Sequence, residues 1–249
     1  KVTHTRALGA EVLLYGDNFD EAREYALELA KHEGLLFIHP YDDAKVIAGQ
    51  GTIALEMLDI MPDLDAILVP IGGGGLIAGI ATAAKGINPN IEIYGVESAR
   101  FNSMYARIKG VPPCFGSVTI ADGIAVKVPG ELTSKIVSEL VADIFLVAED
   151  EIEEAMLLLL EIEKTLVEGA GAVGLAALKK NKDLFQGKNV GLILCGGNVD
   201  PLTLTAIIER GMVKSGRLVR LNVHMTDLPG SLAVVTRILG ECNANIDEV

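Results

Sequence analysis

The stretch Asp65-Ala-Ile-Leu-Val-Pro-Ile-Gly72-Gly-Gly-Gly75-Leu76 joins an apolar run to four consecutive glycines. An uncharged segment with helical character follows directly, from Leu76 to Ala84. Because glycine has no Cβ, successive backbone N–H groups of such a loop can converge on one point. The N-terminus of a helix adds partial positive charge and unpaired N–H donors at the same place. The stretch therefore predicts a buried strand, a phosphate-binding loop and a buried helix.

Two other interpretations apply to the same residues. The glycines can form a tight turn that binds nothing, and the motif alone leaves this alternative open. The run from Ala66 to Ala84 also lacks charge over a length that could cross a membrane. Pro70 and the glycines are poor helix formers, which argues against one continuous membrane helix. We therefore expect a strand and a helix separated by a loop.

The composition limits the classes of function. The chain has 249 residues, half of them hydrophobic, and a formal net charge of −13. It can build a sizeable core, but it lacks the basic face that binding to nucleic acid or anionic lipid requires. The three cysteines are far apart and the four histidines share no metal-ligand spacing. We expect a cytoplasmic protein with no nucleic-acid partner, no membrane partner and no metal.

Strand and helix patterns alternate along most of the chain. Strands are expected at 10–14, 35–39, 67–71, 91–96 and 190–194, and helices at 20–32, 47–58, 76–84, 131–141, 149–166 and 201–211. This alternation predicts an α/β fold with a parallel sheet flanked by helices. Ligands of such sheets bind at the carboxyl ends of the strands. Because 72–75 and 195–198 both follow strands, we expect these two segments to share one site.

The pattern changes near residues 214–217. An alternating strand over 218–225, a turn at Asp227-Leu-Pro-Gly230 and a helix over 231–242 predict the opening βαβ unit of a small separate domain. The first residue is Lys1, and the last, Val249, falls where a further strand begins. We interpret the chain as part of a longer protein.

Six motifs in order carry a resemblance to a known family. They are Pro40-Tyr-Asp-Asp43, Val46-Ile-Ala-Gly-Gln-Gly-Thr52, Pro70-Ile-Gly-Gly-Gly-Gly-Leu76, Thr119-Ile-Ala-Asp-Gly123, Val167-Glu-Gly-Ala-Gly171 and Cys195-Gly-Gly-Asn198. Together they resemble threonine dehydratase (threonine ammonia-lyase), a fold-type-II pyridoxal-phosphate family related to serine racemase. The resemblance covers residues 1 to about 213 and implies a tryptophan synthase β-like fold. The tail resembles the start of an ACT regulatory domain.

The resemblance also implies a domain plan and a cofactor site. The plan is a remnant of a small domain at 1–36, a large cofactor-binding domain at 37–213 and a truncated ACT domain at 217–249. The implied cofactor is pyridoxal 5′-phosphate, bound by Gly72, Gly73, Gly74, Gly75, Leu76, Cys195, Gly196 and Asn198. The glycines match the clamp on the cofactor phosphate, and Cys195 matches the Ser or Cys that faces the pyridine nitrogen. A neutral thiol there does not force this nitrogen to stay protonated.

Three of the site residues have a plainer interpretation. Cys195 taken without its neighbours is typical of an inert buried thiol. Asn198 either lines the site or only turns the chain. Glu168 corresponds to a residue of the family's pocket region, or it is a surface carboxylate at a helix end. The residues alone leave the last two choices open.

The chain departs from the family pattern in two places. The family's cofactor-binding lysine lies in a Ser-Phe-Lys type of motif, and no lysine here has that context. We interpret Lys45 and Lys85 as solvated charges and assign no catalytic residue. In serine racemase relatives a divalent-cation site uses a Glu at a strand end and an acidic residue six positions later. Glu97 matches the first position, but Ser103 occupies the second, so we expect no metal.

The resemblance implies deamination of L-threonine to 2-oxobutanoate and ammonia. Two alternatives are a serine dehydratase or serine racemase on the same scaffold, and a non-catalytic amino-acid sensor. The implied partners are an amino-acid substrate, further copies of the same chain in a homo-oligomer, and an amino-acid effector such as isoleucine or valine at the ACT domain. Alternatively, the ACT domain only aids assembly.

Overall fold

The computed structural model describes residues 2–17 and 19–246. The chain divides into two compact units, one extending to Gly211 and one beginning at Met212. We describe each unit by itself. No helix in these ranges is both long enough and apolar enough to cross a membrane.

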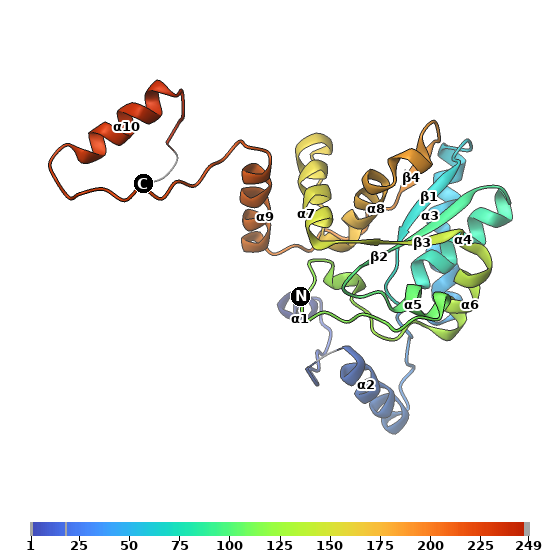
Figure 1. The fold of residues 1–249 in the computed structure, drawn as a ribbon. Coiled ribbons are helices and arrows are strands. Elements are labelled where there is room, and N and C mark those ends of the chain that lie inside the picture. Colours follow the sequence, from blue (N-terminus) through green and yellow to red (C-terminus); the bar gives the residue numbers. More distant parts are fainter. Residues whose placement is uncertain (1, 18, 247–249) are drawn as a thin grey trace. The chain divides into compact units, whose positions relative to one another are not determined.

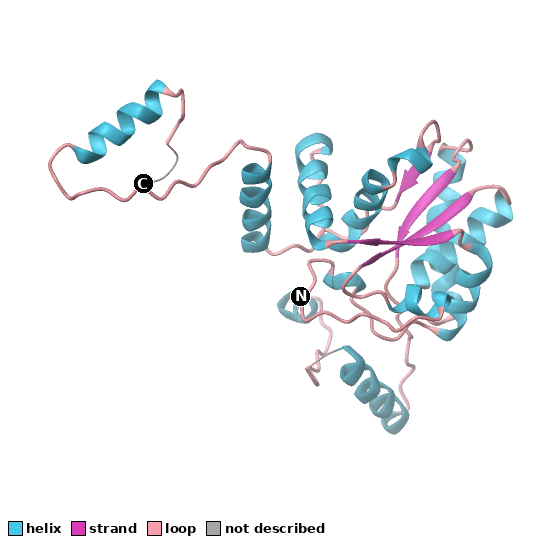
Figure 2. Cartoon of the chain, in the orientation of Figure 1, coloured by secondary structure: helices cyan, strands magenta, loops and turns pink. Residues whose placement is uncertain are grey.

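The first unit is built on a four-stranded parallel sheet with the order β3-β2-β1-β4 (Figures 1 and 2). The strands are β1 (Ala66–Pro70), β2 (Glu92–Ser98), β3 (Asp143–Val147) and β4 (Val190–Leu192). In the register, Leu68 lies opposite both Tyr94 and Leu192. All five residues of β1 are buried, as expected for a central strand covered on both faces. The structure confirms the predicted α/β fold with a parallel sheet flanked by helices.

Helices cover both faces of this sheet (Figure 1). One face packs against α3 (Ala44–Ile60), α4 (Gly75–Ile87), α5 (Ser103–Lys109) and α6 (Glu131–Leu140), and the other against α7 (Glu149–Leu158) and α8 (Gly169–Lys180). Helix α9 (Pro201–Lys214) contacts α7, where Arg210 pairs with Glu153. Side chains of a strand alternate between faces. Accordingly, Ile67 and Val69 belong to the core cluster formed with α3 and α4, and Ala66 and Leu68 belong to the cluster formed with α7 and α8.

Helices α3 and α4 approach each other closely at two glycines. A Cβ placed on Gly79 would overlap with the backbone oxygen of Ile47, and one placed on Gly51 would lie 3.0 Å from the oxygen of Gly79. The glycine in the middle of α4 is therefore explained by helix packing inside the domain.

Further elements complete the first unit. They are α1 (Val2–Ala7), α2 (Phe19–Glu33), two short 3-10 helices, η1 (Asp122–Ile124) and η3 (Lys182–Phe185), and the π-helical turn η2 (Leu159–Glu163). The predicted helix over 149–166 thus ends as an α-helix at Leu158, and Lys164 adopts a left-handed conformation with a φ of 56°.

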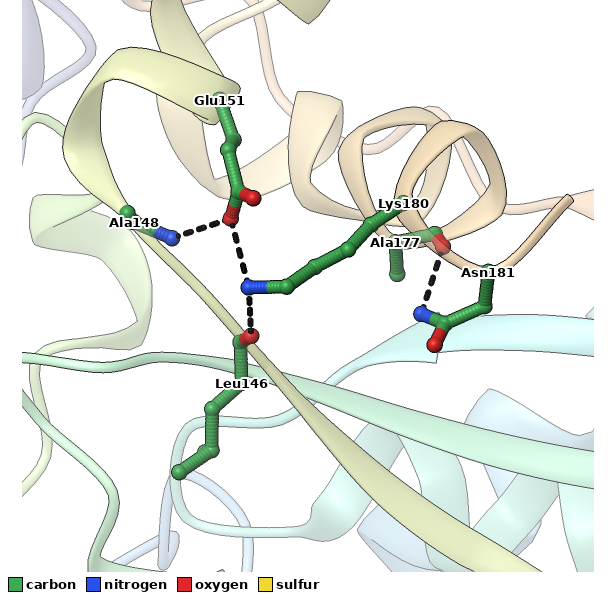
Figure 3. Close-up of polar contacts among 6 residues, drawn as sticks. All are labelled: Leu146, Ala148, Glu151, Ala177, Lys180 and Asn181. Atoms are coloured by element: carbon green, nitrogen blue, oxygen red, sulfur yellow. Dashed lines mark hydrogen bonds and ion pairs between the residues drawn. The ribbon is translucent and has the colours of Figure 1, made fainter.

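The connection from β3 to α7 is held by a lysine from a distant helix (Figure 3). Glu151 accepts a hydrogen bond of 2.7 Å from the backbone nitrogen of Ala148, at the start of α7. The Nζ atom of Lys180, at the end of α8, lies 3.0 Å from the same carboxylate oxygen and 3.1 Å from the carbonyl oxygen of Leu146. Lys180 therefore ties the end of α8 to both elements.

Three predicted strands are wrong. Residues 10–14, 35–39 and 218–225 form irregular segments, and most of their apolar side chains are exposed, Leu36 to 88%. A strand needs neighbours that complete its backbone hydrogen bonds. No strand in the described ranges pairs with these three segments, so their apolar patterns do not produce a sheet.

The described residues of the second unit, 212–246, contain one further helix, α10 (Ser231–Glu241). The predicted helix over 231–242 is confirmed, and Gly230 precedes it in a left-handed conformation with a φ of 91°. Because the strand predicted before it is absent from the described residues, the βαβ unit of an ACT domain is not formed there. The apolar residues Leu232, Val234 and Ile238 on this helix are about half exposed.

Candidate functional site

The glycine loop lies between the end of β1 and the start of α4. Gly74 has a φ of 96° and precedes the first turn of α4. A Cβ on Gly73 would overlap with the ring of Tyr41, and a Cβ on Gly74 would lie 2.6 Å from Cε of Met104. Side chains thus pack tightly against one side of the loop, and these two positions have no room for anything larger than glycine.

The amide groups of the loop are available as donors. In the described ranges, the N–H groups of Gly73, Gly74, Gly75 and Leu76 have no hydrogen-bond acceptor. The first intrahelical bond runs from the nitrogen of Ala78 to the oxygen of Gly74. Unpaired amides at the N-terminus of a helix, with no side chain in the way, form a site for an anion such as phosphate.

The motif that follows Thr119 lies against this loop. A Cβ on Gly72 would be 3.3 Å from Cα of Ile124. The motif is held by Glu149 at the start of α7, which accepts hydrogen bonds of 2.7 Å from Oγ1 of Thr119 and 2.8 Å from the nitrogen of Ile120. This partly buried carboxylate fixes the turn beside the glycine loop.

The Cys195–Asn198 segment continues from β4 at the same edge of the sheet. The nitrogen of Ile193 still donates to the oxygen of Leu68 in β1, at 3.3 Å. Cys195 is partly buried, and burial, followed by the charge of Glu168, raises the pKa of its thiol. The thiol therefore stays neutral at physiological pH, and it is a weak hydrogen-bonding group and not a nucleophile.

Glu168 contacts both the Cys195–Asn198 segment and the Thr119–Gly123 motif. Its backbone nitrogen donates to the oxygen of Gly196 at 3.1 Å, and its carboxylate accepts a 2.9 Å hydrogen bond from the nitrogen of Asn198. The other carboxylate oxygen lies 3.2 Å from the position of a Cβ on Gly123. These contacts favour the interpretation of Glu168 as a pocket residue over that of a surface carboxylate. Asn198 is exposed, and its contact with Glu168 is made through the backbone.

The other polar residues singled out in the sequence lie elsewhere. Lys45 is exposed on α3, and Lys85, near the end of α4, donates to the oxygen of Pro89 at 3.1 Å. Lys85 also lines an open cleft of about 460 Å³ with Glu92 and Glu139. Glu92 begins β2, so this cleft is at the amino ends of the strands, opposite the glycine loop.

Glu97 is buried at 1% exposure. Its carboxylate accepts hydrogen bonds from the nitrogens of Met104 (2.9 Å) and Tyr105 (2.8 Å), and burial raises its pKa to about 7. Ser103 donates instead to the oxygen of Val126. The part of the chain that the structure describes has no cluster of three metal-ligating side chains.

Sequence reasoning missed the residues behind the loop. Thr133 on α6 donates from Oγ1 to the carbonyl oxygen of Gly73 at 2.8 Å, and the nitrogen of Gly130 donates to the same oxygen at 3.1 Å. Asp42 contacts α6 in turn. Two adjacent aspartates before a helix are a local signal for a cap, but no sequence pattern connects Asp42 with residues some ninety positions later.

A family model described as pyridoxal-phosphate dependent enzyme matches residues 1–196. The chain therefore belongs to the family of pyridoxal-phosphate dependent enzymes. It is 51% identical over 253 residues to an L-threonine ammonia-lyase of Geobacter sulfurreducens and 45% identical over 248 residues to one of Thermotoga maritima. Each match covers 99% of this chain and 62% of the relative, so the chain spans about three fifths of the length of these proteins.

Solved structures agree with this assignment. The processed form of threonine deaminase isoform 2 from Solanum lycopersicum matches with a TM-score of 0.78 and 39% identity, over 85% of this chain and 60% of the other. Maize serine racemase matches with a TM-score of 0.75 and 34% identity, over 84% of this chain and 67% of the other.

The residues present fit the cofactor of this family. The unpaired amides from Gly73 to Leu76 suit its phosphate. The neutral thiol of Cys195 suits a pyridine nitrogen that carries no proton. The assignment of Gly72, Gly73, Gly74, Gly75, Leu76, Cys195, Gly196 and Asn198 to the cofactor stays a prediction.

Proposed function

We propose that the protein to which this chain belongs is a lyase that converts L-threonine into 2-oxobutanoate and ammonia with pyridoxal phosphate. The similarity to two L-threonine ammonia-lyases over 99% of the chain supports the reaction and the amino-acid substrate. The observation that carries the cofactor site is the row of unpaired amides between β1 and α4.

In this proposal, the residues of this chain bind pyridoxal phosphate and orient it. The amides of Gly73 to Leu76 would hold the phosphate, and the neutral thiol of Cys195 would be the partner of the ring nitrogen. Glu168 fixes the segment that carries the thiol. When bound, the cofactor supplies an electron sink for bonds at the substrate α-carbon, and the protein positions it. No proton transfer at the α-carbon is assigned to a residue of this chain.

A serine-specific reaction is the second candidate, because maize serine racemase shares this fold at 34% identity. Both candidates are tested by supplying the intact protein with pyridoxal phosphate and either L-threonine or L-serine. We expect 2-oxo acid formation with a kcat/KM at least about tenfold higher for threonine. A preference for serine, or formation of D-serine, would favour the second candidate. Formation of neither product would leave amino-acid sensing as the function.

For the tail we propose a role in regulation. Gly230 has the positive φ that allows a tight entry into α10, and the exposed apolar residues of α10 require a partner surface. We infer a homo-oligomer whose activity responds to isoleucine or valine.

Calorimetric titration of the intact protein with these amino acids tests the regulatory role. Gly230→Val serves as control, because valine strains a backbone with φ of 91°. We expect binding at millimolar ligand or below in the parent protein and a marked loss in the variant. Absence of binding, with catalysis unaffected, would leave assembly as the role of the tail.

A further inference from the structure

We propose that Asp42 and Thr133 are positioning residues of the phosphate loop. Asp42 anchors the start of helix α6, and α6 holds the Gly73 carbonyl through Thr133, so that the Gly74 N–H faces the phosphate. The inference rests on the proposed function, because it concerns the same loop.

The first contact joins Asp42 to α6. Its two carboxylate oxygens accept hydrogen bonds from the nitrogens of Glu131 (2.9 Å) and Thr133 (3.1 Å). Gly130, the residue before α6, offers no capping side chain of its own. Asp42 therefore caps the helix from a distant part of the chain, and its negative charge suits the positive end of the helix dipole. A Cβ on Gly130 would overlap with the Asp42 carboxylate, so this contact requires glycine.

Asp42 is itself held in place. Its backbone nitrogen donates to Nδ1 of His39 at 2.8 Å. The neighbouring Tyr41 donates from its hydroxyl to the oxygen of Val128 at 2.9 Å. Tyr41 and Asp42 both form hydrogen bonds with the 128–133 segment. The start of α6 therefore has a defined position relative to the glycine loop.

The second contact joins α6 to the loop. Thr133 Oγ1 and the nitrogen of Gly130 both donate to the Gly73 carbonyl. The described residues contain no cis peptide bond, and in a trans peptide the C=O and the following N–H point in opposite directions. Fixing the Gly73 carbonyl toward α6 therefore turns the Gly74 N–H away from α6, into the space where the phosphate binds.

The chain supplies a matched control for a purely structural role. Asp43 has the same side chain, is adjacent, and also caps a helix: it accepts from the nitrogens of Lys45 (2.8 Å) and Val46 (3.2 Å) at the start of α3. Neither of these contacts involves α6 or the glycines. Loss of the Asp43 cap therefore reports on stability without a direct effect on the loop.

The first experiment compares Asp42→Ala with Asp43→Ala in the intact protein. It measures the dissociation constants of pyridoxal phosphate and of inorganic phosphate, together with thermal unfolding without ligand. We expect Asp42→Ala to weaken both ligands by about tenfold. Asp43→Ala should lower the unfolding temperature similarly but keep both constants within about twofold. Equal ligand binding by the two variants would overturn the proposal.

The second experiment keeps the side-chain shape and removes only the donor. Thr133→Val should weaken both ligands by about fivefold, and Thr133→Ser should restore parental binding, because it keeps the hydroxyl. Parental affinity in Thr133→Val would overturn the proposal even where Asp42→Ala fails to fold. If the parent protein binds inorganic phosphate but not pyridoxal phosphate, the proposed function fails, and the phosphate constants still decide this inference. A parent that binds neither ligand contradicts both.

Discussion

At the residue scale, the site depends on how carboxylates are placed. Glu149 and Glu168 each use their oxygens to hold backbone amides of the segments around the glycine loop. Glu97 does the same for the start of α5, but in a fully buried place. Their different surroundings lead to two predictions, one on the pKa of the Cys195 thiol and one on how stability depends on pH.

Glu168→Gln is expected to lower the pKa of the Cys195 thiol. The negative charge of Glu168 is the second cause of the raised thiol pKa, after burial, so its removal favours the thiolate. Glutamine keeps an oxygen that can accept from the nitrogen of Asn198. The rate of alkylation of Cys195 against pH, in a variant without the other two cysteines, measures the effect. An unchanged or raised pKa would show that the carboxylate charge does not reach the thiol.

Glu97→Gln is expected to change how stability depends on pH. Burial raises the folded-state pKa of Glu97 to about 7, so between the unfolded value and pH 7 the folded chain binds the extra proton. Its contribution is therefore fully present below about pH 4.5 and is lost as pH rises through 7. Denaturant unfolding from pH 5 to 8 should show a shallower decline with pH for the variant than for the parent. Identical slopes would mean that Glu97 is charged throughout.

At the element scale, sequence patterns succeed where local chemistry decides the structure. The apolar run, the glycines and the uncharged helix predict β1, the loop and α4 correctly, because the signals are consecutive. Strand β3 is missed, since it begins with the exposed and polar Asp143. Helix α8 is missed because its three glycines lower the helix propensity of the segment. The network from Asp42 to Gly73 leaves no local pattern at all.

The crossing of α3 and α4 gives a stability prediction. Gly79→Ala should destabilise the fold by about 1–3 kcal/mol, because the added Cβ overlaps with the Ile47 carbonyl and forces the helices apart. Gly86→Ala is the matched control in the same helix. A Cβ there meets nothing within 4 Å, so alanine should stabilise by up to about 1 kcal/mol. Chemical denaturation of both variants tests the pair, and equal effects would contradict the close approach.

At the scale of the whole molecule, the chain contains an α/β unit with a parallel sheet and a C-terminal tail, and it spans 62% of the length of two L-threonine ammonia-lyases. The motifs from residue 40 to 198 were sufficient to predict the family and the fold. The irregular segments at 10–14, 35–39 and 218–225 show the limit of this approach, because a strand also depends on partners that its own residues do not supply. The division into domains at 36 and 213 stays a prediction.

The central claim is that the Gly72–Gly75 loop binds the cofactor phosphate. It is tested most directly by titrating pyridoxal phosphate into the intact protein, as parent, Gly73→Val and Cys195→Ser. The valine side chain would collide with Tyr41 and displace the loop, so its affinity should fall by at least about a hundredfold. Serine keeps a neutral hydrogen-bonding group and should bind within about threefold of the parent. Parental affinity in Gly73→Val would contradict the account.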